Sequence, residues 1–498
     1  MHYINMAREE EIVKERLKKI EKMNKNGILT YAYRFDSTTN CEEIRKKFSN
    51  LKNEEETKEK VSLSGRILSI RDIGKIIFLK IMDRTDEIQI VLQEGKTPKE
   101  KINFVKEYID IGDIVGISGI VFKTKRGELS ILCDNFQLLT KSILPLPQEF
   151  YGLKEIEERY RKRYLDLILN KKAREVFLIR AKLLEAMREF MKIKGFIEVE
   201  TPLLQPIYGG AHAKPFKTHC DAFDSDVFLS IAPELYLKKA MVGGMGSVYE
   251  ITKKFRNEGV DKSHNPEHMT LEWYQENADY EDGMKLFEEF VLYLAKKVLG
   301  RTYLEYKGNK IDLTKWEKIS LEDAIKKYLE IDISKIKTDK EAKEIAKRKG
   351  LDESKITKIN LPDELMKLFR EKLIQPTFLI DYPIELAPLA KPSKKDPTKA
   401  EIFQPFIGGL EVGRAYSELS DPFIQEEHFN QQEKERELGN EEAMPTDRDF
   451  VTALKYGLPP ACGVGIGIER FVMLFTDSET IRDVIMFPFM KPENLKKE

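Results

Sequence analysis

The sequence lacks several features that mark special classes of protein. Its 498 residues include four cysteines, Cys41, Cys133, Cys220 and Cys462, which show neither a disulfide framework nor the spacing of a zinc finger. It has no run of about 18 apolar residues, so no membrane-spanning helix is predicted. The net charge is −1, from 84 basic and 85 acidic residues, which excludes a generally basic nucleic-acid coat and an acidic disordered tail. These absences indicate a reduced, globular, cytoplasmic protein.

Short β-rich runs fill the chain between residues 61 and 139, with glycines and charged residues at the turns. A helix is predicted at 99–108, between the third and fourth of these runs. This order favours a small closed barrel of the OB type over a β-sandwich. We therefore expect a helical extension at 1–60, a barrel at 61–145 and a proline-containing linker at 146–153.

The remaining residues, 154–498, predict a second and larger unit. Apolar residues at helical spacing predict a long helix at 171–194, which ends at Gly195. Strands and helices then alternate without the regular rhythm of a doubly wound parallel sheet. Residues 315–375 are rich in lysine and glutamate at helical spacing, and they predict a helical insertion.

Three groups of residues in this unit could carry chemistry, although each is weak evidence alone. Gly195-Phe-Ile-Glu-Val-Glu-Thr-Pro202 predicts a corner between a helix and a strand. Arg256 and Glu272 are predicted on adjacent antiparallel strands, where an arginine fork suits a phosphate or carboxylate, but a surface hairpin with ion pairs has the same pattern. The string GVGIGIER at 463–470 places glycines at alternate positions of a strand, which suits either a ligand or tight packing.

Together and in this order, the three groups resemble motifs 1, 2 and 3 of class II aminoacyl-tRNA synthetases, and their details resemble lysyl-tRNA synthetases of subclass IIb. The resemblance extends from the barrel strands to MFPFMKP near the C-terminus, and several long strings in the right order make it specific. The supporting strings are RYRKRYLDLILN, TPLLQPIYGGAHAKPF, IAPELYLKKAMVGG, FRNEG with HNPE, ENADY, AYSEL, ALKYGLPP and GIGIER.

The resemblance implies a multidomain α+β protein, with an OB-fold anticodon-binding domain before a catalytic antiparallel sheet flanked by helices. It implies an AMP-forming aminoacyl-tRNA ligase that joins L-lysine to ATP as lysyl-adenylate and then charges tRNA(Lys). Positioning and charge neutralisation carry such chemistry. The resemblance also implies Mg²⁺ as a cofactor and a homodimer formed through motif 1, between Gly195 and Pro202.

The ATP-binding and catalytic residues implied by the resemblance are Arg256, Glu258, His264, His268 and Arg470. Arg256 is expected on the α-phosphate and the lysine carboxylate, and Arg470 on the γ-phosphate. Glu411 resembles a magnesium-binding carboxylate, which suits a hard cation, and Gln404 stands at the position of a second ligand.

A lysine substrate carries two ammonium groups, and each needs acidic or acceptor groups once it leaves water. The lysine-binding residues implied by the resemblance are Gly210, Glu234, Glu272, Tyr274, Tyr416 and Glu418. The α-amino group is expected at Glu234 and Glu272, and the ε-amino group at Glu418 and Tyr274. Tyr416 is expected along the aliphatic stem.

In the barrel, Arg66, Phe78 and Gln89 resemble the residues that read the anticodon, with Glu128 as a further candidate. Aromatic stacking combined with hydrogen bonds to base edges is how OB-folds read unpaired RNA. Phe78 lies in the run Ile76-Ile-Phe-Leu79, so its position in the core is the alternative.

Five positions depart from the family pattern. Gln404 replaces a glutamate, Arg414 an asparagine, His268 a phenylalanine that stacks on adenine, His212 a small or uncharged residue and Pro445 an aromatic residue. One hypothesis is that Arg414 replaces a magnesium ion beside the phosphates. The alternatives are neutral drift, with the arginine turned to solvent, and an altered choice of substrate.

Two other functions stay open at this point. The first is a related synthetase with a different amino acid, such as aspartate or asparagine, or the paralogue that attaches a lysine analogue to an elongation factor. Aspartate would need a cation where Glu418 stands, and the paralogue lacks the barrel. The second is a non-catalytic tRNA-binding homologue, against which the retained Arg256, Glu411 and Arg470 argue.

Overall fold

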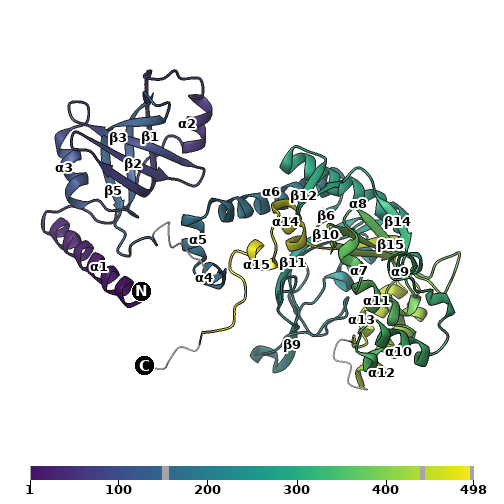
Figure 1. Cartoon of the computed structure of the whole chain (residues 1–498). Helices are drawn as coiled ribbons and strands as arrows, with labels where there is room; N and C mark the ends of the chain where they lie inside the picture. Colours follow the sequence, from purple (N-terminus) through teal and green to yellow (C-terminus); the bar gives the residue numbers. More distant parts are fainter. Residues whose placement is uncertain (1, 148–155, 438–442, 494–498) are drawn as a thin grey trace. The chain divides into compact units, whose positions relative to one another are not determined.

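The structure is a computed structural model, and it describes residues 2–147, 156–437 and 443–493. The chain forms two compact units, Met1–Leu153 and Lys154–Glu498 (Figure 1). The expected linker at 146–153 lies outside the described residues except for Leu146 and Pro147. Among the described helices, none combines the length and the apolar character needed to cross a bilayer.

The first unit contains a closed barrel, which confirms the predicted OB-fold. Its elements are β1 (Glu56–Asp72), β2 (Ile76–Met82), β3 (Glu87–Gln93), α3 (Lys99–Tyr108), β4 (Ile114–Lys123) and β5 (Leu129–Thr140). The strands close in the order β1-β2-β3-β5-β4. β3 and β5 run parallel, and the other neighbours run antiparallel. The interior is apolar because alternate residues of each strand, such as Leu63 and Ile67 of β1, point inward.

The chain before β1 belongs to the core of this barrel, which differs from the boundary expected at residue 61. Two helices, α1 (His2–Lys25) and α2 (Cys41–Lys47), precede β1. Met23 of α1 and Cys41 and Ile44 of α2 are buried in the same apolar cluster as the barrel strands. β1 itself begins at Glu56, in a charged segment whose side chains are mostly exposed. Because the side chains at the start of β1 are charged and exposed, the sequence of this segment resembles a solvated extension.

The second unit is built on a mixed sheet with the strand order β14-β15-β16-β18-β19-β11-β10-β6, and β17 pairs with β16. The strands are β6 (Ile197–Glu198), β10 (Val248–Phe255), β11 (Glu267–Glu276), β14 (Glu317–Ser320), β15 (Thr377–Ile380), β16 (Ile402–Ile407), β17 (Leu410–Glu411), β18 (Gly413–Ser417) and β19 (Ala461–Gly467). Two neighbouring pairs, β14–β15 and β10–β6, are parallel. The central strands are antiparallel, as predicted.

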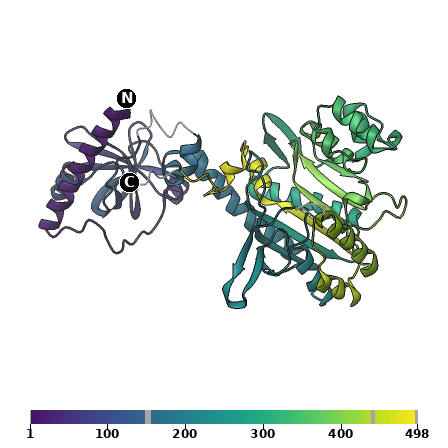
Figure 2. The ribbon, with the colours of Figure 1, turned by 90° about the horizontal axis from the view of Figure 1, so that it is seen from below.

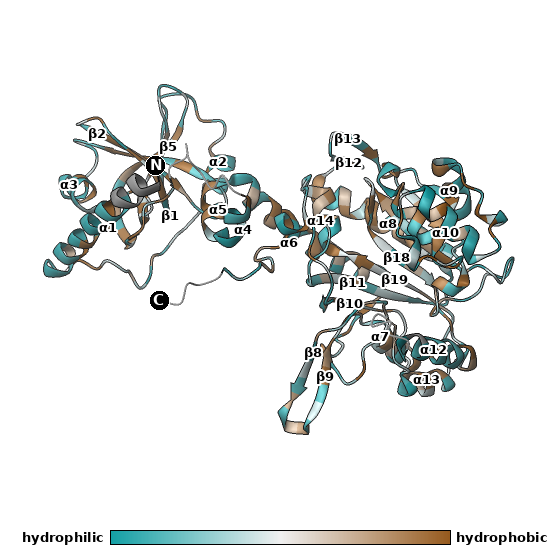
Figure 3. Ribbon diagram, turned by 60° about the horizontal axis from the view of Figure 1, so that its bottom comes forward, coloured by the Kyte–Doolittle hydropathy of each residue, from teal (hydrophilic) through white to brown (hydrophobic). Residues whose placement is uncertain are grey.

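Helices cover both faces of this sheet (Figure 3). On one face lie α6 (Lys171–Ile193), α8 (Tyr280–Leu294) and α14 (Ile468–Thr476); on the other lie α7 (Glu234–Val242), α12 (Pro422–Glu437) and α13 (Arg448–Lys455). Leu271 and Trp273 of β11 are buried in the core with Phe287 of α8. Because side chains alternate along a strand, Glu272 and Tyr274 point to the opposite face.

The predicted helical insertion lies between β14 and β15, although the first residues of the expected range 315–375 form β14 itself. Figure 2 shows its three helices, in green, gathered at one end of the unit. They are α9 (Leu321–Leu329), α10 (Asp339–Arg348) and α11 (Leu361–Lys367). They share an apolar core with the adjoining strands, which includes Ala342 and Leu365.

Shorter elements complete the unit. They are α4 (Ile156–Arg161), α5 (Arg163–Leu169), β7 (Leu204–Gln205), β8 (Lys217–Cys220), β9 (Ser225–Leu229), β12 (Tyr303–Tyr306), β13 (Asn309–Asp312) and α15 (Ile481–Val484). β8 and β9 form a hairpin that stands out from the body of the unit in Figure 3.

Candidate active site

A cavity of about 350 Å³ lies on the face of the sheet toward α7, and β19 forms its floor. Gly463, Gly465 and Gly467 of β19 line it. A Cβ atom on Gly463 would lie 2.1 Å from Oε1 of Glu418 and 2.5 Å from Cε1 of Tyr274. At Gly465 the nearest atom to an added Cβ would be Oε2 of Glu272 at 3.7 Å, an ordinary contact distance, so a methyl group would fit here. The glycines therefore let functional side chains and a ligand lie directly on the strand.

The register of the sheet explains why residues far apart in sequence meet here. Glu272 of β11 and Arg414 of β18 both pair with Gly465, one from each side. Tyr274 and Tyr416 both pair with the next glycine of the row in the same way. Paired residues of antiparallel strands project from the same face. The same face of these three strands thus carries Glu272 and Arg414 in one row and Tyr274 and Tyr416 in the next.

One end of the cavity is acidic. Glu234 at the start of α7, Glu272 of β11 and Glu418 just after β18 line this end, and we call these three residues the acid cage. The hydroxyl of Tyr416 donates to Oε1 of Glu234 at 2.7 Å, and the hydroxyl of Tyr274 donates to Oε1 of Glu272 at 2.7 Å. The two phenols hold the carboxylates in place while adding no charge.

The acid cage is electrostatically costly without a cation. Burial, together with the negative charge of Glu234, raises the pKa of Glu272 to about 8. Burial raises the pKa of Glu418 to about 8 as well, although Lys238 opposes the rise. Oε1 of Glu418 is buried and has no hydrogen-bond partner among the described residues. A ligand ammonium group at this oxygen would supply the missing donor and lower both pKa values.

The sequence patterns do not single out Lys238, a buried lysine that supports the cage. Its Nζ donates to Oε1 of Glu234 at 2.6 Å and forms an ion pair with Glu418. The signal was present in the string IAPELYLKKAMVGG, because a lysine four residues after a glutamate lies on the same face of a helix.

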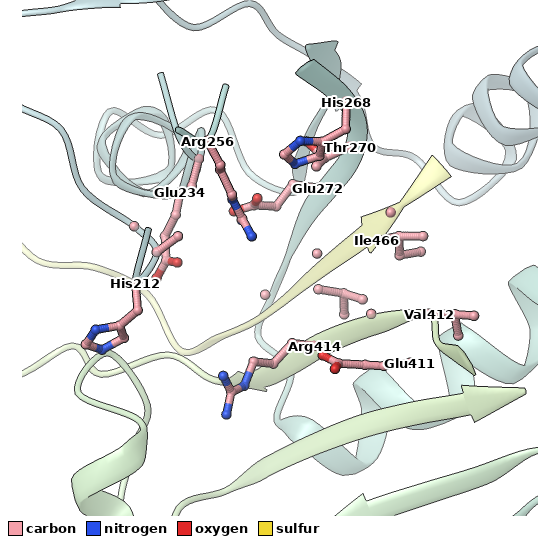
Figure 4. A pocket seen from close by; sticks show the side chains of 18 of the residues that line it. His212, Glu234, Arg256, His268, Thr270, Glu272, Glu411, Val412, Arg414 and Ile466 are labelled. Carbon is pink, nitrogen blue, oxygen red and sulfur yellow. The ribbon is translucent and has the colours of Figure 1, made fainter. Parts of the chain in front are cut away.

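The other end of the cavity is cationic, and three guanidinium groups line it. Arg256, directly after β10, is half-buried, and its Nε has no partner among the described residues. Arg470 donates from Nη1 to the backbone oxygen of Glu411 at 2.6 Å. Arg414 lies on the wall opposite Arg256, near Glu411 (Figure 4). Its guanidinium carbon is 5.8 Å from the ring centre of Tyr382.

Two histidines stand beside these arginines and line the same cavity. Burial and the charges of Arg256 and Arg470 lower the pKa of His268 to about 3. Burial and the charge of Arg414 lower the pKa of His212. Both rings are therefore neutral near pH 7. Arg414 lines the cavity and is partly buried.

The loop between β10 and β11 brings two more predicted residues, Glu258 and His264, to the cavity lining. His264 contacts Oδ2 of Asp261 through Nδ1 at 2.8 Å. At the acidic end, Gly210 also lines the cavity, with φ at +84°. A Cβ there would lie 2.8 Å from Cβ of Glu234, so only glycine fits.

The residues present fit one magnesium ion better than two. Glu411 lines the cavity and suits a cation that is held by one or two carboxylates together with substrate phosphates. Gln404 differs from expectation: it is 2% exposed and lies off the cavity lining. Its Oε1 accepts a hydrogen bond from Tyr382, and its Nε2 donates to Glu411 at 3.5 Å. In the described parts of the chain, no three acidic, histidine or cysteine side chains form a metal-binding group.

In the barrel, the predicted anticodon readers lie on the outer surface. Phe78 is partly exposed between the buried Ile77 and Leu79, which excludes the alternative that it belongs to the core. Gln89 of β3 donates to the Ser130 hydroxyl at 2.9 Å. Arg66 of β1 donates to the backbone oxygen of Gly112 at 2.7 Å, and Glu128 is exposed just before β5.

Register places three of these residues on one surface. Arg66 pairs with Met82, and Gln89 pairs with Lys80. Met82 and Lys80 alternate with Phe78 along β2, so all of them face outward from the barrel.

A barrel of the OB type joined to an antiparallel sheet with an arginine-lined cavity is the architecture of a class II tRNA synthetase. Comparison with known families agrees: residues 155–491 match tRNA synthetases class II (D, K and N), and residues 61–139 match the OB-fold nucleic acid binding domain. The chain belongs to the class II tRNA synthetases of the D, K and N group.

Individual relatives narrow the comparison. The chain is 46% identical over 490 residues to a lysine–tRNA ligase of Clostridium botulinum (strain Langeland), covering 97% of this chain and 96% of that protein. It is 46% identical over 488 residues to one of Clostridium novyi, covering 97% and 94%. It is 45% identical over 479 residues to one of Fervidobacterium nodosum, covering 96% and 94%.

Proposed function

We propose that the protein is a lysine–tRNA ligase that activates L-lysine with ATP and transfers it to tRNA(Lys). The observation that carries this proposal is that one cavity is lined both by the acid cage and by three guanidinium groups. An amino acid with a cationic side chain places its ammonium groups at the acids and its carboxylate toward Arg256. The phosphates of ATP occupy the rest of the cationic end.

In the first half-reaction, an oxygen of the lysine carboxylate attacks the α-phosphorus of ATP. A bond forms between that oxygen and phosphorus, the bond between the α-phosphorus and the bridging oxygen breaks, and pyrophosphate leaves. Arg256, whose Nε has no partner in the part of the chain that the structure describes, holds the two reacting anions together, and Arg470 holds the γ-phosphate. His268, neutral at pH 7, packs against the adenine, and Glu258 and His264 border the nucleotide from the loop.

Glu411 is the residue that would hold Mg²⁺ together with the ATP phosphates, and the ion would neutralise their charge. Gln404, which contacts Glu411 from behind the cavity lining, and Arg414 add no second carboxylate beside Glu411 for the metal.

In the second half-reaction, a hydroxyl of the terminal ribose of tRNA attacks the carbonyl carbon of lysyl-adenylate, and AMP leaves as the ester forms. Phe78 stacks on an anticodon base, while Arg66, Gln89 and Glu128 supply polar contacts to its neighbours. A cytoplasmic location is part of the same proposal.

A homodimer formed through the motif 1 region is part of the same proposal. Exposed apolar side chains follow one another from the end of α6 through β6 to β7, which supports a contact surface there. They are Ile193, Ile197, Leu203, Leu204 and Ile207.

The test is amino-acid-dependent exchange of pyrophosphate into ATP, measured without tRNA across lysine, arginine, ornithine, aspartate and asparagine. We expect exchange with lysine, and a loss of at least about 100-fold in kcat/KM for lysine in Glu418→Gln, whose amide donates where an acceptor is needed. Exchange with another amino acid would instead support an altered substrate. A folded protein that binds tRNA but supports no exchange would be the non-catalytic homologue.

A further inference from the structure

Lys238 is a charged residue at the active site that the reaction itself does not use. Its side chain is fully buried in α7 and does not line the cavity. Three rings, Tyr274, Tyr416 and Phe450, have centres 5.9, 5.7 and 5.8 Å from its Nζ. The ammonium group therefore contacts the acid cage from the protein side, while the cavity meets the same carboxylates from the other side.

The contacts of Lys238 leave oxygens available to a ligand. At Glu234, both protein donors, Lys238 Nζ and the Tyr416 hydroxyl, reach the same oxygen, Oε1. At Glu418, Lys238 pairs with Oε2, and Oε1 lies over Gly463 without a hydrogen-bond partner among the described residues. One lysine thus fixes the orientation of two carboxylates.

The charge balance of the acid cage also indicates a role for Lys238 in lysine binding. With every group ionised, the three carboxylates and one ammonium carry two net negative charges, and a lysine substrate brings two ammonium groups. Without Lys238, Glu234 and Glu418 would lose the ammonium group that pairs with both of them, and Lys254 would still act on Glu272. Buried carboxylates in that situation take up protons, and a protonated carboxyl group is a poor partner for an ammonium group.

We propose that Lys238 is a positioning residue for amino-acid selection: it pairs with Glu234 and Glu418 and orients both carboxyl groups so that the cage matches the two ammonium groups of lysine. This inference rests on the proposed lysine activation. Lys238 does not contact the substrate but acts through Glu234 and Glu418. Its substitution should therefore weaken lysine binding and leave nucleotide binding unchanged.

The test is lysine-dependent ATP–pyrophosphate exchange by Lys238→Met and Lys238→Gln, with the KM for lysine and for ATP measured separately from pH 6 to 9. We expect the KM for lysine to rise by at least about 100-fold, as expected when one partner of a buried ion network is removed. The KM for ATP should stay within about threefold, because no guanidinium group of the cationic end contacts Lys238 in the described residues.

The pH profile separates positioning from simple support of the fold. The titratable groups that face Lys238 are Glu234, Glu272, Glu418, Tyr274 and Tyr416. Lys238 opposes the protonation of Glu272 and Glu418, so the pH at which lysine use reaches its half-maximum should move upward in Lys238→Met. Lys238→Arg, which keeps the charge, should recover part of the lysine affinity and the original profile.

A double variant keeps the proposal testable if stability falls. Because Lys238 acts through Glu418, the combined effect of Lys238→Met and Glu418→Gln on the KM for lysine should be smaller than the sum of the single effects. The matched control is Lys141→Met in the barrel. Lys141 is also fully buried and pairs with Asp110 and Asp113, so its loss should destabilise the first unit without changing the KM for lysine.

The outcomes are distinct. An unchanged KM for lysine and an unchanged pH profile in folded Lys238→Met would overturn the role of Lys238 and leave the proposed function intact. Equal rises in the KM for lysine and ATP, or strict additivity with Glu418→Gln, would also overturn it. Absence of lysine-dependent exchange in the wild-type protein would overturn the proposed function itself.

Discussion

Glu272 and Arg414 flank the same residue, Gly465, in register from opposite sides. The glycine strand therefore separates an acid from a guanidinium across the floor of one cavity. The ammonium groups of an amino acid and the phosphates of a nucleotide can therefore bind on different sides of this strand. The glycines of β19 therefore influence the binding of both ligands. Each glycine can be substituted separately to test this.

Gly463→Ala and Gly465→Ala should behave differently. A methyl group at 463 would collide with Glu418 and Tyr274, so we expect a loss of about 1–3 kcal/mol in unfolding free energy and a higher KM for lysine. At 465 the nearest neighbour would be 3.7 Å away, and stability should change little. Urea denaturation and exchange kinetics measure both. Equal effects at the two positions would contradict this geometry.

Lysine use should fall as the pH falls below about 8, the pKa of Glu272 and of Glu418. These carboxyl groups are protonated in the free enzyme at lower pH and must lose their protons to bind ammonium groups. The KM for lysine should rise about tenfold per pH unit for each group that must ionise. Glu418→Gln should flatten the profile, whereas a flat profile in the wild-type protein would contradict the prediction.

The same two groups set a pH dependence of stability. Their pKa values are raised from 4.5, so the folded state binds more protons than the unfolded state between about pH 4.5 and 8. The contribution of these groups to the unfolding free energy is present below pH 4.5 and is lost as the pH rises through 8. With saturating lysine, the melting temperature should no longer fall as the pH rises from about 4.5 to 8, because bound ammonium groups keep the carboxylates ionised.

Arg414 should contribute to ATP binding and not to lysine binding. We expect Arg414→Asn to raise the KM for ATP by about tenfold, the loss of one charge-assisted contact of roughly 1.5 kcal/mol. A double variant with Gln404→Glu should change the magnesium concentration needed for half-maximal exchange, because it adds a carboxylate beside Glu411. An unchanged magnesium requirement in the double variant would count against the idea that the arginine replaces a metal ion.

Phe78→Ala should reduce tRNA charging while leaving tRNA-free exchange intact. Loss of one base stack of about 1–3 kcal/mol corresponds to a rise of roughly 5- to 150-fold in the KM for tRNA. Ile76→Ala, on the same outward row of β2, is the matched control. A parallel loss of exchange would show that the substitution damages more than the anticodon surface.

Leu204→Asp should convert a dimer into monomers. Leu204 is 57% exposed and lies in the apolar segment after motif 1, so a charge there opposes burial between two copies. Sedimentation at several concentrations measures the change. Leu144→Asp is a control of similar exposure, at 62%, in the first unit. If both variants sediment like the wild-type protein, the dimer surface lies elsewhere or the protein is monomeric.

The sequence predicted the architecture well where periodicity is regular and less well where tertiary neighbours decide. The barrel strands and the helix at 99–108 follow from alternation and turn residues, whereas the antiparallel core was implied by the resemblance to class II synthetases. The boundary at residue 61 differs from the structure because α2 is short and charged, and only its contact with the barrel reveals that Cys41 and Ile44 are core residues.

The site residues also divide into those named by sequence patterns and those decided by tertiary contacts. Arg256, Glu272, Glu418 and Arg470, which were named from the resemblance, all line one cavity. Lys238 lies in a helix with a second lysine beside it, a pattern typical of a solvated face, and only the fold reveals its burial. For Gln404, sequence position suggested a metal ligand, but the hydrogen bond from Tyr382 that occupies its oxygen is a tertiary contact.

The burial of Met23, Cys41 and Ile44 against the barrel strands has a practical consequence for dissecting the protein. An anticodon-binding fragment that starts at the first strand would leave a gap in its own interior and expose apolar surface to aggregation. A fragment that includes both upstream helices would keep that interior filled.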